Sequence, residues 1–124
     1  MRDARILVVD NECRVLDVMV DVLREAGYSP RSTSESREAA KLLETSAFDL
    51  IVCDVLMPGL NGFQLMEVAR RENPDIRVVF VTGYTTPEVT REAVKRGAAG
   101  IVEKPFRTEE LLAAVRESLE DAPT

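Results

Sequence analysis

Four short, largely apolar segments, each followed by a polar residue, constrain most strongly what this chain can fold into. Continuous apolar runs of this length are typical of strands that are covered on both faces, as in a parallel sheet. The segments are residues 5–9, 49–53, 77–81 and 100–103, followed by Asp10, Asp54, Thr82 and Lys104. Because the carboxyl ends of parallel strands lie at one edge of a sheet, where ligands bind, these four side chains are expected to lie close together.

Each of these four residues alone has a simpler explanation. A single Asp or Thr at the end of a strand usually forms a turn or caps a helix, and a single Lys is usually solvated. The sequence instead places two carboxylates, a hydroxyl and an amine after four separate strands. That combination is hard to explain as four independent turns, and it predicts a functional site.

Helical spacing of apolar residues fills the intervals between the strands. The predicted helices cover residues 13–26, 34–44, 63–73, 87–96 and 108–119, and residues 28–33 add a fifth strand. Pro30 indicates either an edge position for that strand or the start of the strand, whereas Ser34, Thr86 and Thr108 are expected to cap the helices that follow them. The alternation predicts an α/β fold, a single doubly wound five-stranded parallel sheet with five helices and right-handed crossovers.

The length of 124 residues fits one domain, which we expect to occupy residues 1–120, with a polar tail or the start of a linker at 121–124. A net charge of −6 and a pI of about 4.8 argue against direct nucleic acid binding by this segment. No apolar stretch approaches the length of a membrane span, and the first residues do not resemble a signal peptide. A cytoplasmic location is therefore expected.

Histidine is absent from the sequence, which excludes Ser-His and Cys-His catalysis and imidazole metal ligands. The two cysteines, Cys13 and Cys53, lack the spacing of a metal site and are expected to be reduced structural thiols. Any chemistry therefore depends on Asp, Thr and Lys side chains and, where one binds, on a metal ion.

The motifs at the strand ends resemble those of one known family. Their sequences are Val9-Asp10-Asn11-Glu12, Asp54 with Met57-Pro58-Gly59, Thr82-Gly83 and Lys104-Pro105-Phe106. In this order, at the ends of alternating strands, they resemble the receiver domain of two-component response regulators over essentially the whole chain. The resemblance implies a flavodoxin-like sheet of strand order 2-1-3-4-5, in which the strands that end at Asp10 and Asp54 are neighbours.

The resemblance also implies a role for each residue. Asp54 would be the phosphoacceptor, Lys104 and Thr82 would contact phosphoryl oxygens, and Pro105 would follow a cis peptide bond. Mg²⁺ would be the cofactor, because it prefers hard oxygen ligands. Its expected ligands are Asp10, Asn11, Asp54 and the main-chain carbonyl of Leu56.

The same resemblance implies the partners. A sensor histidine kinase or a phosphotransfer protein would donate the phosphoryl group, and the domain would catalyse only its own phosphorylation and dephosphorylation. Phosphorylation would switch the surface formed by residues 87–119, and this face is also a candidate homodimer interface. Neither nucleic acid nor a membrane is an expected partner of this segment.

Several positions depart from the family pattern or carry no clear role. Asn11 stands where the family usually has a second acidic residue, so metal affinity should be lower. Ile101 stands where an aromatic residue is usual, which alters the usual coupling between a threonine and an aromatic ring. Glu12 is expected to be a solvated residue of the first helical turn. Leu56 and Tyr84 are expected to flank the phosphorylation pocket.

Two alternatives remain open. Asn11 supports a degenerate receiver, which would bind partners without being phosphorylated. Asp10, with Glu12 two residues later, also allows an aspartyl-phosphate hydrolase of the haloacid-dehalogenase type. That family has Asp at the second position, an acidic pair after the lysine and a larger fold, and it would leave Asp54 unexplained.

Overall fold

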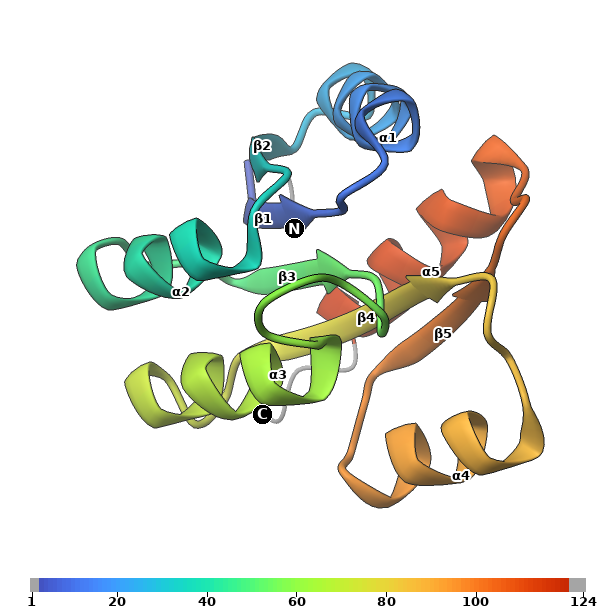
Figure 1. The fold of residues 1–124 in the computed structure, drawn as a ribbon. Coiled ribbons are helices and arrows are strands. Elements are labelled where there is room, and N and C mark those ends of the chain that lie inside the picture. Colours follow the sequence, from blue (N-terminus) through green and yellow to red (C-terminus); the bar gives the residue numbers. More distant parts are fainter. Residues whose placement is uncertain (1–2, 121–124) are drawn as a thin grey trace.

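A computed structural model describes residues 3–120, in which five parallel strands form one sheet with helices on both faces (Figure 1). The strands are β1 (Arg5–Val9), β2 (Ser29–Thr33), β3 (Leu50–Cys53), β4 (Arg77–Thr82) and β5 (Gly100–Glu103). Their order is β2-β1-β3-β4-β5, and each neighbouring pair is parallel. The predicted α/β fold and strand order are confirmed. The tail or linker expected at residues 121–124 lies outside the described residues.

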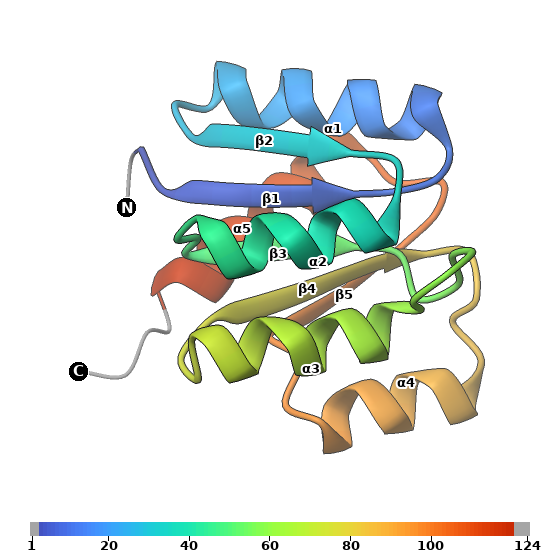
Figure 2. The ribbon, with the colours of Figure 1, turned by 60° about the vertical axis from the view of Figure 1, so that its left-hand side comes forward.

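Five helices connect the strands and cover the two faces of the sheet. They are α1 (Cys13–Glu25), α2 (Ser36–Thr45), α3 (Gly62–Glu72), α4 (Pro87–Lys95) and α5 (Thr108–Glu120). Helices α1 and α5 pack on one face, and α2, α3 and α4 lie on the other (Figure 2). None of the helices within residues 3–120 has both the length and the apolar composition needed to cross a membrane.

Alternate residues of each central strand point into two separate cores. In β1, Ile6 and Val8 pack with α1 and α5, whereas Leu7 and Val9 pack with α2 and α3. All four side chains are fully buried. Burial of both faces explains why these strands are continuous apolar runs and not alternating patterns.

The edge strand β2 differs from the central strands. Within the described residues it pairs with β1 alone, and Pro30 lies opposite Ile6. Three of its five residues are exposed. Proline cannot donate to a second neighbouring strand, so it is tolerated at the edge, as the sequence predicts.

The predicted cap of α4 is confirmed. Thr86 Oγ1 accepts a hydrogen bond from the N–H of Val89 at 3.2 Å, and Pro87 is the first helical residue. Gly97, just after the helix, has a φ of +78°. That left-handed conformation is the usual reason for glycine at the end of a helix.

The predicted caps at Ser34 and Thr108 are wrong. Helix α2 begins at Ser36, because Thr33 Oγ1 accepts the N–H of Glu35 at 3.1 Å and the chain is still turning at Ser34. Thr108 is the first residue inside α5. Serine and threonine favour turns as well as caps, so their type alone does not fix the first helical residue.

Candidate functional site

Asp10 and Asp54 lie next to each other at the carboxyl edge of the sheet. They follow Val9 of β1 and Cys53 of β3, which are paired in the ladder, so both carboxylates extend from the same edge. Asp10 is fully buried and Asp54 is 5% exposed. Two buried carboxylates that lie next to each other repel, so they need a positive charge nearby.

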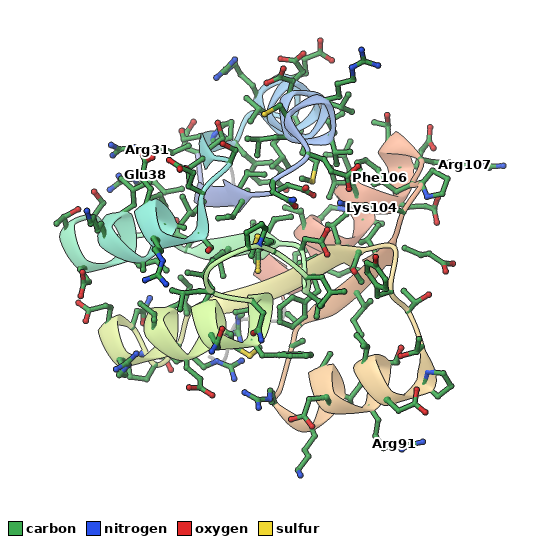
Figure 3. All side chains as sticks on the ribbon, in the orientation of Figure 1. Arg31, Glu38, Arg91, Lys104, Phe106 and Arg107 are labelled. Carbon is green, nitrogen blue, oxygen red and sulfur yellow. The ribbon has the colours of Figure 1, made fainter. Side chains whose placement is uncertain are left out.

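Lys104 supplies that charge from the end of β5. Its Nζ lies 2.7 Å from Asp10 Oδ2 and 2.8 Å from Asp54 Oδ2. The peptide bond between Lys104 and Pro105 is cis, as the family resemblance implies. Figure 3 shows Lys104 and Phe106 where the chain passes from β5 to α5. Three of the strand-end residues therefore meet at one edge, as predicted from the sequence.

Glu12 is the residue of this site that the sequence reasoning missed. Its Oε1 lies 2.9 Å from Lys104 Nζ, although 59% of its side chain stays exposed. Glu12 precedes α1, and within residues 3–120 its side chain makes no capping hydrogen bond to that helix. The carboxylate can therefore reach across to β5. The only signal in the sequence is its position two residues after Asp10.

Burial and ion pairing have opposite effects on the charged groups. Burial raises the pKa of Asp10 above its ordinary value, and the interaction with Lys104 offsets this only in part. Burial alone would lower the pKa of Lys104, but its contacts with three carboxylates outweigh that effect and raise the pKa. Lys104 therefore remains protonated at neutral pH and acts as a fixed positive charge.

The carboxylates at this edge also form a candidate metal site. Ligand atoms of Asp10, Glu12 and Asp54 all lie within 4.8 Å of one another. Asp10 Oδ2 is buried and, in the described part of the chain, has its ion pair with Lys104 but no hydrogen bond of good geometry. Hard carboxylate oxygens in such a cluster fit Mg²⁺ or a similar divalent cation.

Asn11 and Leu56, two further predicted metal ligands, have different surroundings from the carboxylates. Asn11 is exposed and lines an open hollow together with Ser36 and Pro58. The side chain of Leu56 is exposed, and its N–H donates a hydrogen bond to Asp54 Oδ1 at 3.3 Å. The loop after β3 therefore contacts the Asp54 carboxylate. The ligand roles of Asn11 and of the Leu56 carbonyl stay predictions.

Thr82 ends β4 and is fully buried. Its Oγ1 accepts a hydrogen bond from the N–H of Tyr84 at 3.1 Å, and its carbonyl accepts one from the N–H of Lys104 at 2.9 Å. The hydroxyl is thus hydrogen-bonded to the loop that follows β4. Ile101 pairs with Phe80 in the sheet and is partly buried, whereas Tyr84 is 54% exposed.

An open hollow of about 500 Å³ leads from the surface to Asp54 and Lys104. Its walls include Val15 and Val18 of α1 and Phe106 after β5. The site is therefore accessible from one side, through a partly apolar opening.

Comparisons with known proteins agree with this arrangement. Residues 6–116 match the family model described as the response regulator receiver domain. The chain is 32% identical to the nitrogen assimilation regulatory protein NtrX of Azorhizobium caulinodans over 117 residues, which are 93% of this chain and 26% of that protein. It is 31% identical to the response regulator SaeR of Staphylococcus aureus, covering 92% of this chain and 50% of that protein.

Solved structures show the same fold. The chemotaxis protein CheY4 of Vibrio cholerae has a TM-score of 0.87 and 30% identity, covering 94% of this chain and 98% of that one. A CheY-like response regulator receiver domain protein of Methanospirillum hungatei has a TM-score of 0.89 and 28% identity, covering 96% of this chain and 95% of that one.

The chain spans about a quarter of the length of the first curated relatives, 26% of one and 24% of another. The hydrolase alternative is wrong, because it requires another family and a larger fold than the five-stranded order found here. Phosphorylation on an aspartate is general in the matched family. The fold, the acidic edge with its lysine and the match over residues 6–116 show that this chain belongs to the response regulator receiver domain family.

Proposed function

We propose that this receiver accepts a phosphoryl group on Asp54. The observation that supports this most directly is the position of Asp54 at the end of β3, 5% exposed and with Lys104 Nζ 2.8 Å from Oδ2. A carboxylate attacks an anionic phosphoryl group only where charge is neutralised and the groups are well positioned. Asp10 carries the same functional group but is fully buried, which leaves it without access to a donor.

The donor is a phosphohistidine of a sensor histidine kinase or of a phosphotransfer protein. The donor histidine lies outside these 124 residues, because they contain no histidine. A carboxylate oxygen of Asp54 forms a bond to phosphorus while the bond between phosphorus and the donor imidazole breaks. Lys104 pairs with a phosphoryl oxygen and stabilises its negative charge.

Dephosphorylation completes the chemistry of the domain. A water oxygen forms a bond to phosphorus, and the bond between phosphorus and the Asp54 oxygen breaks. Inorganic phosphate leaves and the carboxylate is restored. The chain catalyses only these two steps on itself and turns over no separate substrate.

The cofactor of this proposal is Mg²⁺. Asp10, Asp54, the Leu56 carbonyl and the Asn11 amide oxygen would hold it at the carboxyl edge of the sheet. When bound, the ion neutralises negative charge on the phosphoryl oxygens. Asn11 provides a dipole where a second acidic residue would provide a charge. We therefore expect weaker Mg²⁺ binding than in a receiver with two acidic residues after its first strand.

Phosphorylation would change the surface formed by residues 87–119. The Thr82 hydroxyl, which accepts a hydrogen bond from the N–H of Tyr84, would move to donate one to a phosphoryl oxygen, which alters the loop that leads into α4. This face, on which Val94 of α4 is 68% exposed, stays a candidate homodimer interface. We place the domain in the cytoplasm, where Cys13 and Cys53 stay reduced, with neither nucleic acid nor membrane bound by this segment.

A degenerate receiver, which binds partners without phosphorylation, is the second candidate. The exposed amide of Asn11, in place of a carboxylate, is the observation that favours it. In that case the ion pairs of Lys104 would only stabilise the fold. The two candidates differ in whether Asp54 can be phosphorylated at all.

Intact mass spectrometry separates them. The chain is incubated with acetyl phosphate and Mg²⁺, alongside Asp54→Ala and the control Asp75→Ala, which changes an exposed aspartate after α3. We expect the wild type and Asp75→Ala to gain one phosphoryl group and Asp54→Ala to gain none. A folded wild type that gains nothing at saturating Mg²⁺ supports the degenerate receiver.

A further inference from the structure

Ser36 joins two segments that are far apart in the sequence, the start of α2 and the loop between β3 and α3. Its Oγ donates a hydrogen bond to the carbonyl oxygen of Pro58 at 2.8 Å and accepts one from the N–H of Leu60 at 2.9 Å. The residue is 3% exposed. Loss of this hydroxyl would remove the partner of the Pro58 carbonyl and of the Leu60 N–H, and with it two hydrogen bonds that hold the loop against α2.

The loop that Ser36 contacts carries part of the proposed phosphorylation site. At its start, the N–H of Leu56 donates to Asp54 Oδ1 at 3.3 Å, and at its end the N–H of Gly62 donates to the Val55 carbonyl at 2.8 Å. A Cβ at Gly62 would clash with the Asp54 backbone carbonyl. Backbone contacts therefore fix the two ends of the loop, and Ser36 fixes its middle.

Gly59 shows how closely the loop approaches Ser36. It has a φ of +82°, and a Cβ at this position would lie only 2.9 Å from Ser36 Oγ. Glycine is the residue that takes this conformation and this close approach without strain. The loop backbone therefore passes directly over the Ser36 hydroxyl.

We propose, on the basis of the Mg²⁺ site in the proposed function, that Ser36 is a positioning residue for that site. Its hydroxyl sets the course of residues 54–62 and, through them, the position of the Leu56 carbonyl relative to Asp54. Mg²⁺ requires its oxygen ligands at about 2.0–2.1 Å in near-octahedral geometry, so a small displacement of one ligand is costly. Ser36 acts through the loop and touches neither the metal nor the phosphoryl group.

A role confined to starting helix α2 does not explain these contacts. The residue before the helix is Glu35, which makes no capping hydrogen bond with its side chain among the described residues. The Ser36 hydroxyl bonds Pro58 and Leu60, both outside α2. Its hydrogen bonds therefore serve the loop.

Titration calorimetry with MgCl₂, without any phosphoryl donor, tests the inference on the full chain. Ser36→Ala should raise the Kd for Mg²⁺ by about tenfold, the lower end of the effect seen when a residue that orients a metal ligand is lost. Ser34→Ala removes an exposed hydroxyl two residues earlier and should leave the Kd unchanged. Circular dichroism at the titration temperature confirms that each variant is folded, so a loss of stability alone does not change the result.

Gly59→Ala disturbs the same contact from the side of the loop and should also raise the Kd, which keeps the inference testable if Ser36→Ala does not fold. Equal Kd values for the wild type and a folded Ser36→Ala overturn the role of Ser36 and leave the proposed function intact. An equal loss of Mg²⁺ affinity in Ser36→Ala and Ser34→Ala overturns the role of Ser36 as well. A wild type that binds no Mg²⁺ overturns both this role and the metal requirement of the proposed function.

Discussion

Lys104 Nζ lies 2.8 Å from Asp54 Oδ2, although the two residues are 50 positions apart and follow β5 and β3, two strands separated by β4. The same ammonium group contacts Asp10 and Glu12 at 2.7 and 2.9 Å. One cation thus contacts three carboxylates from two segments of the chain and offsets part of their negative charge. Among the described residues that form this site, Lys104 is therefore the one whose loss should change its charge balance most.

Lys104→Gln should lower the free energy of unfolding of the metal-free protein by about 2 kcal/mol, because it leaves buried carboxylates without their counter-charge. Mg²⁺ should restore much of this loss, since the ion supplies positive charge at the same edge. Urea unfolding in chelator and in MgCl₂ measures both effects. Lys95→Gln, at an exposed lysine of α4, is the control. Equal stability of Lys104→Gln and wild type in chelator would contradict the structure.

Asp10 should destabilise the metal-free protein at neutral pH. Its pKa is raised by burial, so the folded state binds the Asp10 proton more tightly than the unfolded chain does. The contribution of Asp10 to the free energy of unfolding therefore falls as the pH rises from the unfolded pKa of about 3.9 through the raised folded value.

Asp10→Asn should accordingly be more stable than wild type at neutral pH, and the difference should vanish once Asp10 is protonated in both states. Denaturant unfolding in chelator over a range of pH values measures the difference in free energy of unfolding between the variant and the wild type, and so checks its sign. Asp17→Asn, at an exposed residue of α1, controls for net charge. A variant that is less stable than wild type at neutral pH would show that ion pairing with Lys104 outweighs burial.

The sequence predicts most of this site because its residues follow strands, and the ends of parallel strands lie together wherever the apolar pattern fixes the sheet. Asp10, Asp54 and Lys104 meet for that reason. The strand order itself came from the family resemblance, since the apolar pattern alone does not say which strands are neighbours.

Contacts that depend on side-chain direction could not be predicted in this way. Glu12 reaches Lys104 across 92 positions of sequence, and nothing near Glu12 indicates that its carboxylate turns away from the helix it precedes. Ser34 and Ser36 are two serines near the start of one helix, and only the path of the distant loop at Pro58 selects Ser36 for burial. Both contacts are set by tertiary packing, which local patterns do not encode.

Asn11→Asp should tighten Mg²⁺ binding and lower the stability of the metal-free protein. A fourth carboxylate, in addition to those of Asp10, Glu12 and Asp54, attracts a divalent cation but adds repulsion when no cation is bound. We expect a Kd about fivefold to tenfold lower, equivalent to about 1 kcal/mol. Calorimetric titration of MgCl₂ into the wild type and into Asn11→Asp measures the two Kd values. Equal or weaker affinity in the Asp variant would mean that Asn11 does not contact the metal.

The conformational response should be concentrated in the loop after β4 and in α4. Ile101 has no aromatic ring to move, and a β-branched side chain in a strand has few rotamers. Thr82 instead contacts this loop directly, through the N–H of Tyr84. Hydrogen exchange with and without beryllofluoride and Mg²⁺ should therefore show changes mainly within residues 82–97 and small ones around Ile101.

Asp54→Ala, treated in the same way, should show no such change and serves as the control for non-specific effects of beryllofluoride. A uniform change along the chain would argue against this route for the signal. So would a change centred on α5 while the loop before α4 stays unaffected.

The most direct test of the central claim is to locate the phosphoryl group. The chain is treated with acetyl phosphate and Mg²⁺, reduced with sodium borohydride, which converts an aspartyl phosphate to homoserine, and digested for peptide mass spectrometry. We predict homoserine at position 54 and unmodified aspartate at position 10. Homoserine at Asp10, or none at Asp54 in a protein shown to be folded and bound to Mg²⁺, would contradict the assignment of Asp54 as the phosphoacceptor.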